Sequence, residues 1–204
     1  HDGAPITADD VIFSLAAVKE SGTPLFRYYY ANVESAEKLN DHRIKFNFSG
    51  PPNRELPQIV GQLLPILSKK YFETHKFEET TLTPILGSGP YRIKSFEANR
   101  YITYERVPDY WGKDLPINVG RNNFGTLRYD FYRDTAVLLE AFKAGEYDYR
   151  SENSAKSWAT GYNFPAVNQG LVILEEVPNE RSAGMQGYVF NLRREKFQDP
   201  ALRE

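Results

Sequence analysis

The chain has 204 residues, with 25 Lys and Arg against 27 Asp and Glu, and a formal net charge of −2. Its 41% hydrophobic and 25% charged residues are ordinary for a globular protein, and its basic residues are scattered, which argues against both disorder and nucleic acid binding. Cysteine is absent, so disulfides, thiolate metal sites and a cysteine nucleophile are excluded. No apolar run approaches the ~20 residues of a membrane helix, so we expect no direct insertion into a membrane.

The first residues predict a turn that leads into a capped helix. Residues 1–5 contain Gly and Pro, and Thr7 and Asp10 have the spacing of a capping box. The apolar residues that follow recur with helical spacing: Val11, Ile12, Leu15, Ala16 and Val18. Asp199 and Pro200 predict another helix start at the far end. Structural elements at both ends are typical of a piece taken from inside a longer protein, and we expect this chain to be one.

The next part of the chain predicts a hairpin and short helices. Residues 32–50 alternate between polar and apolar side chains and contain a turn signal at 40–42. Residues 53–75 predict one or two short helices, with a break near Leu64 and Pro65. A polar connector and the glycine-rich turn LGSGP follow, and we place a domain boundary near this connector.

Strands return after this turn. Residues 90–111 predict two antiparallel strands joined at Ala98 and Asn99, and residues 124–132 predict another strand. The clearest helix follows, with Asp134 as its N-cap and Gly145 at its end.

Further strands are expected at 147–150, 171–177 and 185–192, with a loop and short helices over 151–170. Helices and short strands are mixed without strict alternation. The expected fold class is therefore α/β (mixed α+β) with mixed sheets.

Signals for catalysis are weak. His occurs only at positions 1, 42 and 75, without zinc-type spacing, and no G-x-S-x-G motif is present. Ser35 and Lys38 fit the S-x-x-K pattern of a penicillin-recognising serine enzyme, but they lie in a predicted strand and no K-T-G follows. We predict no enzyme activity, no cofactor and no metal site, and we retain a serine hydrolase as a distant alternative.

Five motifs occur along the chain in this order: HDGAPITADDVIFSL, LGSGPYRI, YERVPDYWG, FKAGEYDYR and FNLRREKFQDPALRE. Together they resemble the extracytoplasmic solute-binding proteins of bacterial peptide ABC transporters, a family that handles dipeptides, oligopeptides and nickel complexes. The stretches PPNRELPQIVG, YWGKDLPINVGRNNF, SENSAKSWATGYNFPAV and AGMQGYVFNLRR look like its microcin C and murein-peptide branch. The resemblance covers essentially the whole chain.

This resemblance implies a fold of the periplasmic-binding-protein type II kind, with two lobes and a smaller third domain. Residues 1–85 would be part of the small domain and 86–192 part of the first lobe. Residues 193–204 would begin the crossover to the second lobe.

The same resemblance implies a receptor that binds oligopeptides or peptide-like compounds in the periplasm. Its partner would be the membrane permease of an ABC importer. Another solute on the same fold, an oligosaccharide or a metal chelate, is the alternative.

Candidate ligand contacts lie in the loop that follows residue 150 and in the predicted strand 185–192. The loop contributes Glu152, Asn153, Ser154 and Trp158. The strand contributes Met185, Gln186, Tyr188 and Asn191. The competing interpretations are a loop that caps the next helix and ordinary alternation in a central strand.

Overall fold

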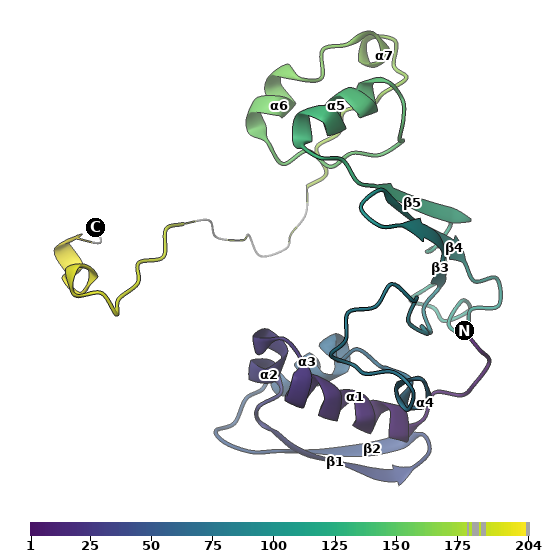
Figure 1. Cartoon of the computed structure of the whole chain (residues 1–204), viewed down its shortest axis with the longest axis vertical. Coiled ribbons are helices and arrows are strands. Elements are labelled where there is room, and N and C mark those ends of the chain that lie inside the picture. Colours follow the sequence, from purple (N-terminus) through teal and green to yellow (C-terminus); the bar gives the residue numbers. More distant parts are fainter. Residues whose placement is uncertain (179, 181–183, 185–186, 203–204) are drawn as a thin grey trace. The chain divides into compact units, whose positions relative to one another are not determined.

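The computed structural model describes residues 1–178, 180, 184 and 187–202 (Figure 1). The chain forms two compact units, His1–Arg133 (unit 1) and Asp134–Glu204 (unit 2). This division lies between Arg133 and Asp134. The boundary predicted near residue 85 would divide the small domain from the first lobe of a longer protein, and it stays a prediction.

Unit 1 begins with the predicted capped helix. Helix α1 spans Ala8–Ser21, and the Asp10 carboxylate accepts a hydrogen bond of 2.8 Å from the backbone N–H of Thr7. This contact confirms the capping box. The short helix α2, Pro24–Tyr29, follows.

The predicted hairpin is also confirmed. Strands β1, Val33–Asn40, and β2, Arg43–Phe48, pair antiparallel around the turn. Helices α3, Leu56–Leu63, and α4, Lys69–Phe72, complete this part of the chain. The apolar side chains of these elements form one buried cluster: Leu15, Val18, Tyr30, Val33, Leu56 and Val60.

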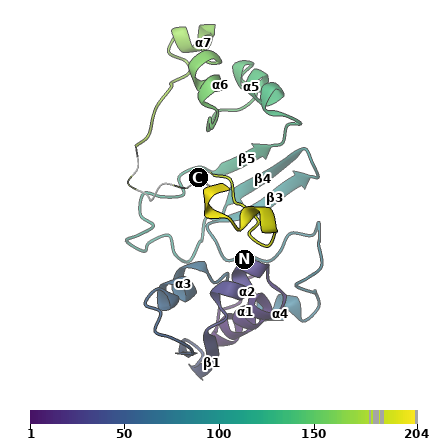
Figure 2. The ribbon, with the colours of Figure 1, turned by 90° about the vertical axis from the view of Figure 1, so that its left-hand side faces the viewer.

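A second sheet follows in unit 1. Strands β3, Tyr91–Glu97, β4, Tyr101–Arg106, and β5, Thr126–Asp130, are antiparallel in the order β3-β4-β5 (Figure 1, Figure 2). Asn99 adopts a φ of 62° in the turn between β3 and β4, a conformation that Asn tolerates better than most residues. The predicted strands and their junction are confirmed.

Unit 2 is built from three helices and their aromatic contacts. They are α5, Thr135–Lys143, α6, Ala155–Thr160, and α7, Pro165–Asn168. The Asp134 carboxylate caps α5 by accepting hydrogen bonds from two backbone N–H groups, at 3.0 and 2.9 Å. Gly145 follows α5 with a φ of +78°, which favours glycine. The cap and the helix end agree with the sequence prediction.

Two strand predictions were wrong. Residues 147–150 and 171–177 form no strand, and neither segment belongs to the sheets of the described residues. A strand exists only through hydrogen bonds to a neighbour, and in the apolar run at 171–174 Ile173 is 82% exposed here.

The end of the chain also differs from expectation. The described part of the third segment, 187–192, contains no strand. Residues 195–197 and 200–202 form single 3₁₀ turns, η1, Glu195–Phe197, and η2, Pro200–Leu202, in place of an α-helix start. Asp199 nevertheless caps the second turn, because its carboxylate accepts a hydrogen bond of 2.9 Å from the Ala201 N–H.

Helices and short strands occur together, so the mixed α and β class is confirmed. The expectation of mixed sheets was wrong for the described residues, because every strand pair among them is antiparallel. Within the described part of the chain, no helix has the length and apolar character needed to cross a membrane.

Candidate functional site

In the predicted ligand loop, the Glu152 carboxylate already accepts hydrogen bonds from other groups of the protein. Glu152 Oε1 accepts a hydrogen bond of 2.8 Å from the Ser154 N–H. Glu152 Oε2 accepts from Arg150 Nη2 and from the Tyr162 hydroxyl, both at 2.9 Å. The side chains of Arg150 and Glu152 are each only 6% exposed. This is a buried ion pair with further hydrogen bonds, the arrangement that a desolvated charge needs.

Arg150 extends this network to helix α5. Its Nε donates to the Tyr162 hydroxyl at 2.8 Å, and its Nη1 donates to the Tyr147 hydroxyl at 3.2 Å. The Tyr147 hydroxyl in turn donates to the Leu138 carbonyl in α5 at 2.8 Å. We call Tyr147, Arg150, Glu152 and Tyr162 the Arg150 network. It connects the loop to helix α5 and to Tyr162, which follows α6.

The electrostatics of the Arg150 network favour the charged forms of both partners. Hydrogen bonding from the Ser154 N–H, and then from Arg150, lowers the pKa of Glu152 from 4.5 to about 2. Burial works against the charge of Arg150, but hydrogen bonds to Tyr147, Glu152 and Tyr162 raise its pKa overall. Burial, and then the bond to Glu152, raises the pKa of Tyr162. The pair therefore stays ionised at neutral pH.

The other predicted loop residues have separate roles. The Ser154 hydroxyl caps α6 by accepting a hydrogen bond of 3.2 Å from the Ser157 N–H. The Trp158 ring lies 5.7 Å from the Tyr162 ring. Asn153 is exposed between Glu152 and Ser154. The structure thus brings this loop set together around one network.

The second predicted set lies in a different environment. Tyr188 is 96% exposed. Asn191 is exposed, and its side-chain oxygen accepts a hydrogen bond of 3.2 Å from the Arg193 N–H. Met185 and Gln186 lie outside the described residues. The ligand contacts of both sets stay predictions.

Sequence reasoning missed Arg150, Tyr147 and Tyr162 as members of the site. The one available signal was the opposite charge of Arg150 and Glu152, two residues apart. Tyr162 is ten residues further along the chain than Glu152, and only the fold of unit 2 places its hydroxyl on that carboxylate.

The S-x-x-K pattern has no catalytic geometry. Ser35 and Lys38 lie on strand β1, and the Ser35 hydroxyl accepts a hydrogen bond of 2.8 Å from Asn47 Nδ2. Lys38 forms ion pairs with Asp9 and Asp41. The hydrogen bonds to Asp41 and then Asp9 raise the pKa of Lys38, the opposite of what a general base needs.

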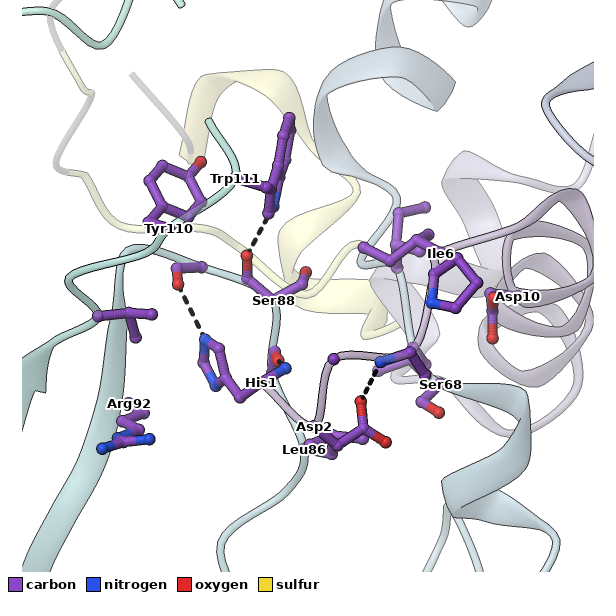
Figure 3. Close-up of a pocket in the computed structure, with 18 of the residues that line it drawn as sticks. His1, Asp2, Ile6, Asp10, Ser68, Leu86, Ser88, Arg92, Tyr110 and Trp111 are labelled. Atoms are coloured by element: carbon purple, nitrogen blue, oxygen red, sulfur yellow. Dashed lines mark hydrogen bonds between the residues drawn. The ribbon is translucent and has the colours of Figure 1, made fainter. Parts of the chain in front are cut away.

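Unit 1 contains a cavity of about 780 Å³ near the first residues of the chain. Figure 3 shows Tyr110 and Trp111 near Ser88, where the Trp111 indole donates a hydrogen bond of 3.0 Å to the Ser88 carbonyl. His1 Nε2 lies 2.9 Å from the Gly89 carbonyl oxygen. Polar groups of the wall thus bond to one another. Among the described residues, no cluster of His, Cys, Asp and Glu suits a metal ion.

Comparisons with known proteins cover the whole chain. Residues 1–204 match the family model "Bacterial extracellular solute-binding proteins, family 5 Middle". A "Probable peptide-binding protein YejA" of Agrobacterium fabrum is 48% identical over 100% of this chain and 34% of its own length. A "Peptidoglycan-binding protein YepA" of the same bacterium is 40% identical over 100% of this chain and 34% of its length. The chain therefore spans about a third of the length of these curated relatives.

Solved structures share the fold. The oligopeptide-binding protein AppA of Bacillus subtilis, solved in complex with a nonapeptide, matches with a TM-score of 0.64 and 24% identity. The match covers 80% of this chain and 32% of that one. At this identity the likeness supports the fold alone.

Proposed function

Because this chain belongs to the bacterial extracellular solute-binding proteins of family 5, we propose that it is part of a peptide receptor of an ABC importer. The observation that carries the proposal is the 48% identity, along the entire chain, to a protein named as a probable peptide-binding protein. The receptor works outside the cytoplasmic membrane, in the periplasm, and delivers its ligand to a membrane permease.

The proposed mechanism is closure around an extended peptide. Two lobes enclose the ligand, and binding shifts an existing balance between open and closed forms. In this chain, residues 1–85 belong to the small domain, 86–192 to the first lobe and 193–204 to the start of the crossover. The loop of unit 2 faces the ligand and contributes hydrogen bonds to peptide amides.

Peptidoglycan-derived peptides are a second ligand class. The observation that favours them is the 40% identity to a protein named as peptidoglycan-binding. Both classes share the peptide main chain, so a site that recognises backbone amides serves both. A serine hydrolase is not favoured, because Lys38 is held between two carboxylates.

Titration calorimetry on the full-length protein tests the proposal. The probes are trialanine, the peptidoglycan stem tripeptide, maltotriose and a nickel–histidine chelate. We expect binding of at least one peptide and no binding of the sugar or the chelate. Binding of maltotriose or the chelate alone would replace the peptide receptor by a receptor for that solute.

A further inference from the structure

We infer that Glu152 is a positioning residue that fixes residues 151–154, and that Asn153 is the side chain this loop offers to the ligand. The inference rests on the proposed function, because it concerns the peptide contacts of the same loop. It replaces the expectation that Glu152 itself contacts the ligand.

The hydrogen bonds of Glu152 leave little capacity for a ligand. Oε1 is used by the Ser154 N–H, and Oε2 is shared by Arg150 and Tyr162. The side chain is 6% exposed. A ligand group would have to break a buried ion pair in order to reach this carboxylate, and the loss of a partner in a buried pair is strongly unfavourable.

The charge of Glu152 is also neutralised inside the network. Arg150 supplies the compensating positive charge at 2.9 Å. Neither Asn153 nor Ser154 carries a charge. Residues 151–154 therefore present no free negative charge to the ammonium group of a peptide. This loop suits neutral amide groups instead.

Asn153 has the properties that such a contact needs. It is exposed, while its neighbours Glu152 and Ser154 are occupied by the network and by the cap of α6. Its side-chain amide offers two donors and one acceptor oxygen, which can pair with both groups of a peptide unit. The network fixes the backbone on both sides of it, so little conformational entropy is lost when it binds.

The experiment compares peptides with and without a charged amino terminus. Trialanine and N-acetyl-trialanine are titrated into the full-length protein and its variants Glu152→Gln, Asn153→Ala and Glu146→Gln. Glu146 is an exposed carboxylate in the same unit and serves as the control for the loss of one charge.

We expect Glu152→Gln and Asn153→Ala each to lower the binding affinity for both peptides about tenfold, which is the effect of losing one hydrogen bond. The affinity ratio of the two peptides should stay at its wild-type value in both variants, and Glu146→Gln should change nothing. A loss confined to trialanine in Glu152→Gln would make Glu152 the anchor of the ammonium group and overturn the inference. Unchanged affinity in Asn153→Ala would remove Asn153 from the site.

Hydrogen exchange of the ligand-free protein tests the positioning role separately. The Ser154 N–H should exchange faster in Glu152→Gln, and also in Tyr162→Phe, which keeps the ion pair but removes one hydroxyl. It should not change in Glu146→Gln. Unchanged exchange in the first two variants would overturn the positioning role. Wild-type protein that binds neither peptide would count against the proposed function, while exchange would still decide the role of Glu152.

Discussion

The two compact units differ in the interactions that stabilise each of them internally. Unit 1 has a buried apolar cluster that joins α1, α3 and the hairpin. Among the described residues of unit 2, Tyr162 is the one aromatic or aliphatic side chain that is buried. Its hydroxyl hydrogen-bonds to both members of the Arg150–Glu152 ion pair. The packing of an apolar core does not depend on acid, whereas a buried ion pair depends on the charge of each of its partners. The two units should therefore respond differently to mutation and to acid.

The largest effect on stability is expected from a substitution that creates a cavity in the apolar cluster of unit 1. Leu15→Ala removes a buried side chain from the apolar cluster and should lower the free energy of unfolding by about 2–5 kcal/mol. Urea denaturation, with hydrogen exchange to locate the loss in unit 1, measures this. Leu39→Ala, at an exposed position of β1, is the control. Equal losses in both variants would contradict the assigned core.

A smaller loss should follow from breaking the Arg150 network. Arg150→Ala leaves Glu152 without its charged partner and should cost about 1.5–3 kcal/mol, with the loss confined to unit 2. Lys143→Ala breaks an exposed ion pair with Glu140 and should cost no more than about 0.5 kcal/mol. Urea denaturation and exchange measure both losses. Similar losses of unfolding free energy in the two variants would show that the network stabilises unit 2 no more than an exposed ion pair does.

Acid should destabilise unit 2 through the same network. The pKa of Glu152 is lowered in the folded protein, to about 2, so its contribution is complete above its unfolded pKa near 4.5. That contribution is lost as the pH falls from about 4.5 to 2. Protection factors in unit 2, which are corrected for the intrinsic pH dependence of amide exchange, should therefore fall over this range in the wild type. The fall should be smaller in Glu152→Gln, and an identical acid response would show that Glu152 is not the group responsible.

The smallest effect concerns the cap of α5. Asp134→Ala removes the acceptor of two backbone N–H groups and should cost about 1 kcal/mol. Asp134→Asn retains an acceptor oxygen and should therefore keep most of the stability that Asp134→Ala loses. Thermal unfolding of the three proteins compares them. No difference between the two variants would mean that the side-chain oxygen does not matter.

The sequence predicted best those elements whose hydrogen bonds are local, although it also predicted β5, which pairs with the more distant strand β4. The capping box of α1, the β1–β2 hairpin and the cap of α5 each depend on residues close together in the chain. The strands expected at 147–150 and 171–177 depend on partners elsewhere, and the sequence does not say whether those partners are present.

The candidate site divides in the same way. The position of the loop after residue 150 followed from the motif, and Ser154 follows the rule for helix caps. The burial of Glu152 did not follow, because it depends on Tyr162 reaching back across ten residues. A charged residue in a polar loop looks exposed until the fold supplies its partners.

The most direct test of the peptide receptor is native mass spectrometry of the full-length protein purified from a bacterial extract without added ligand. The account predicts a bound component that dissociates as a peptide or a peptidoglycan-derived peptide. A bound sugar or metal chelate, with no peptide in any preparation, would contradict it.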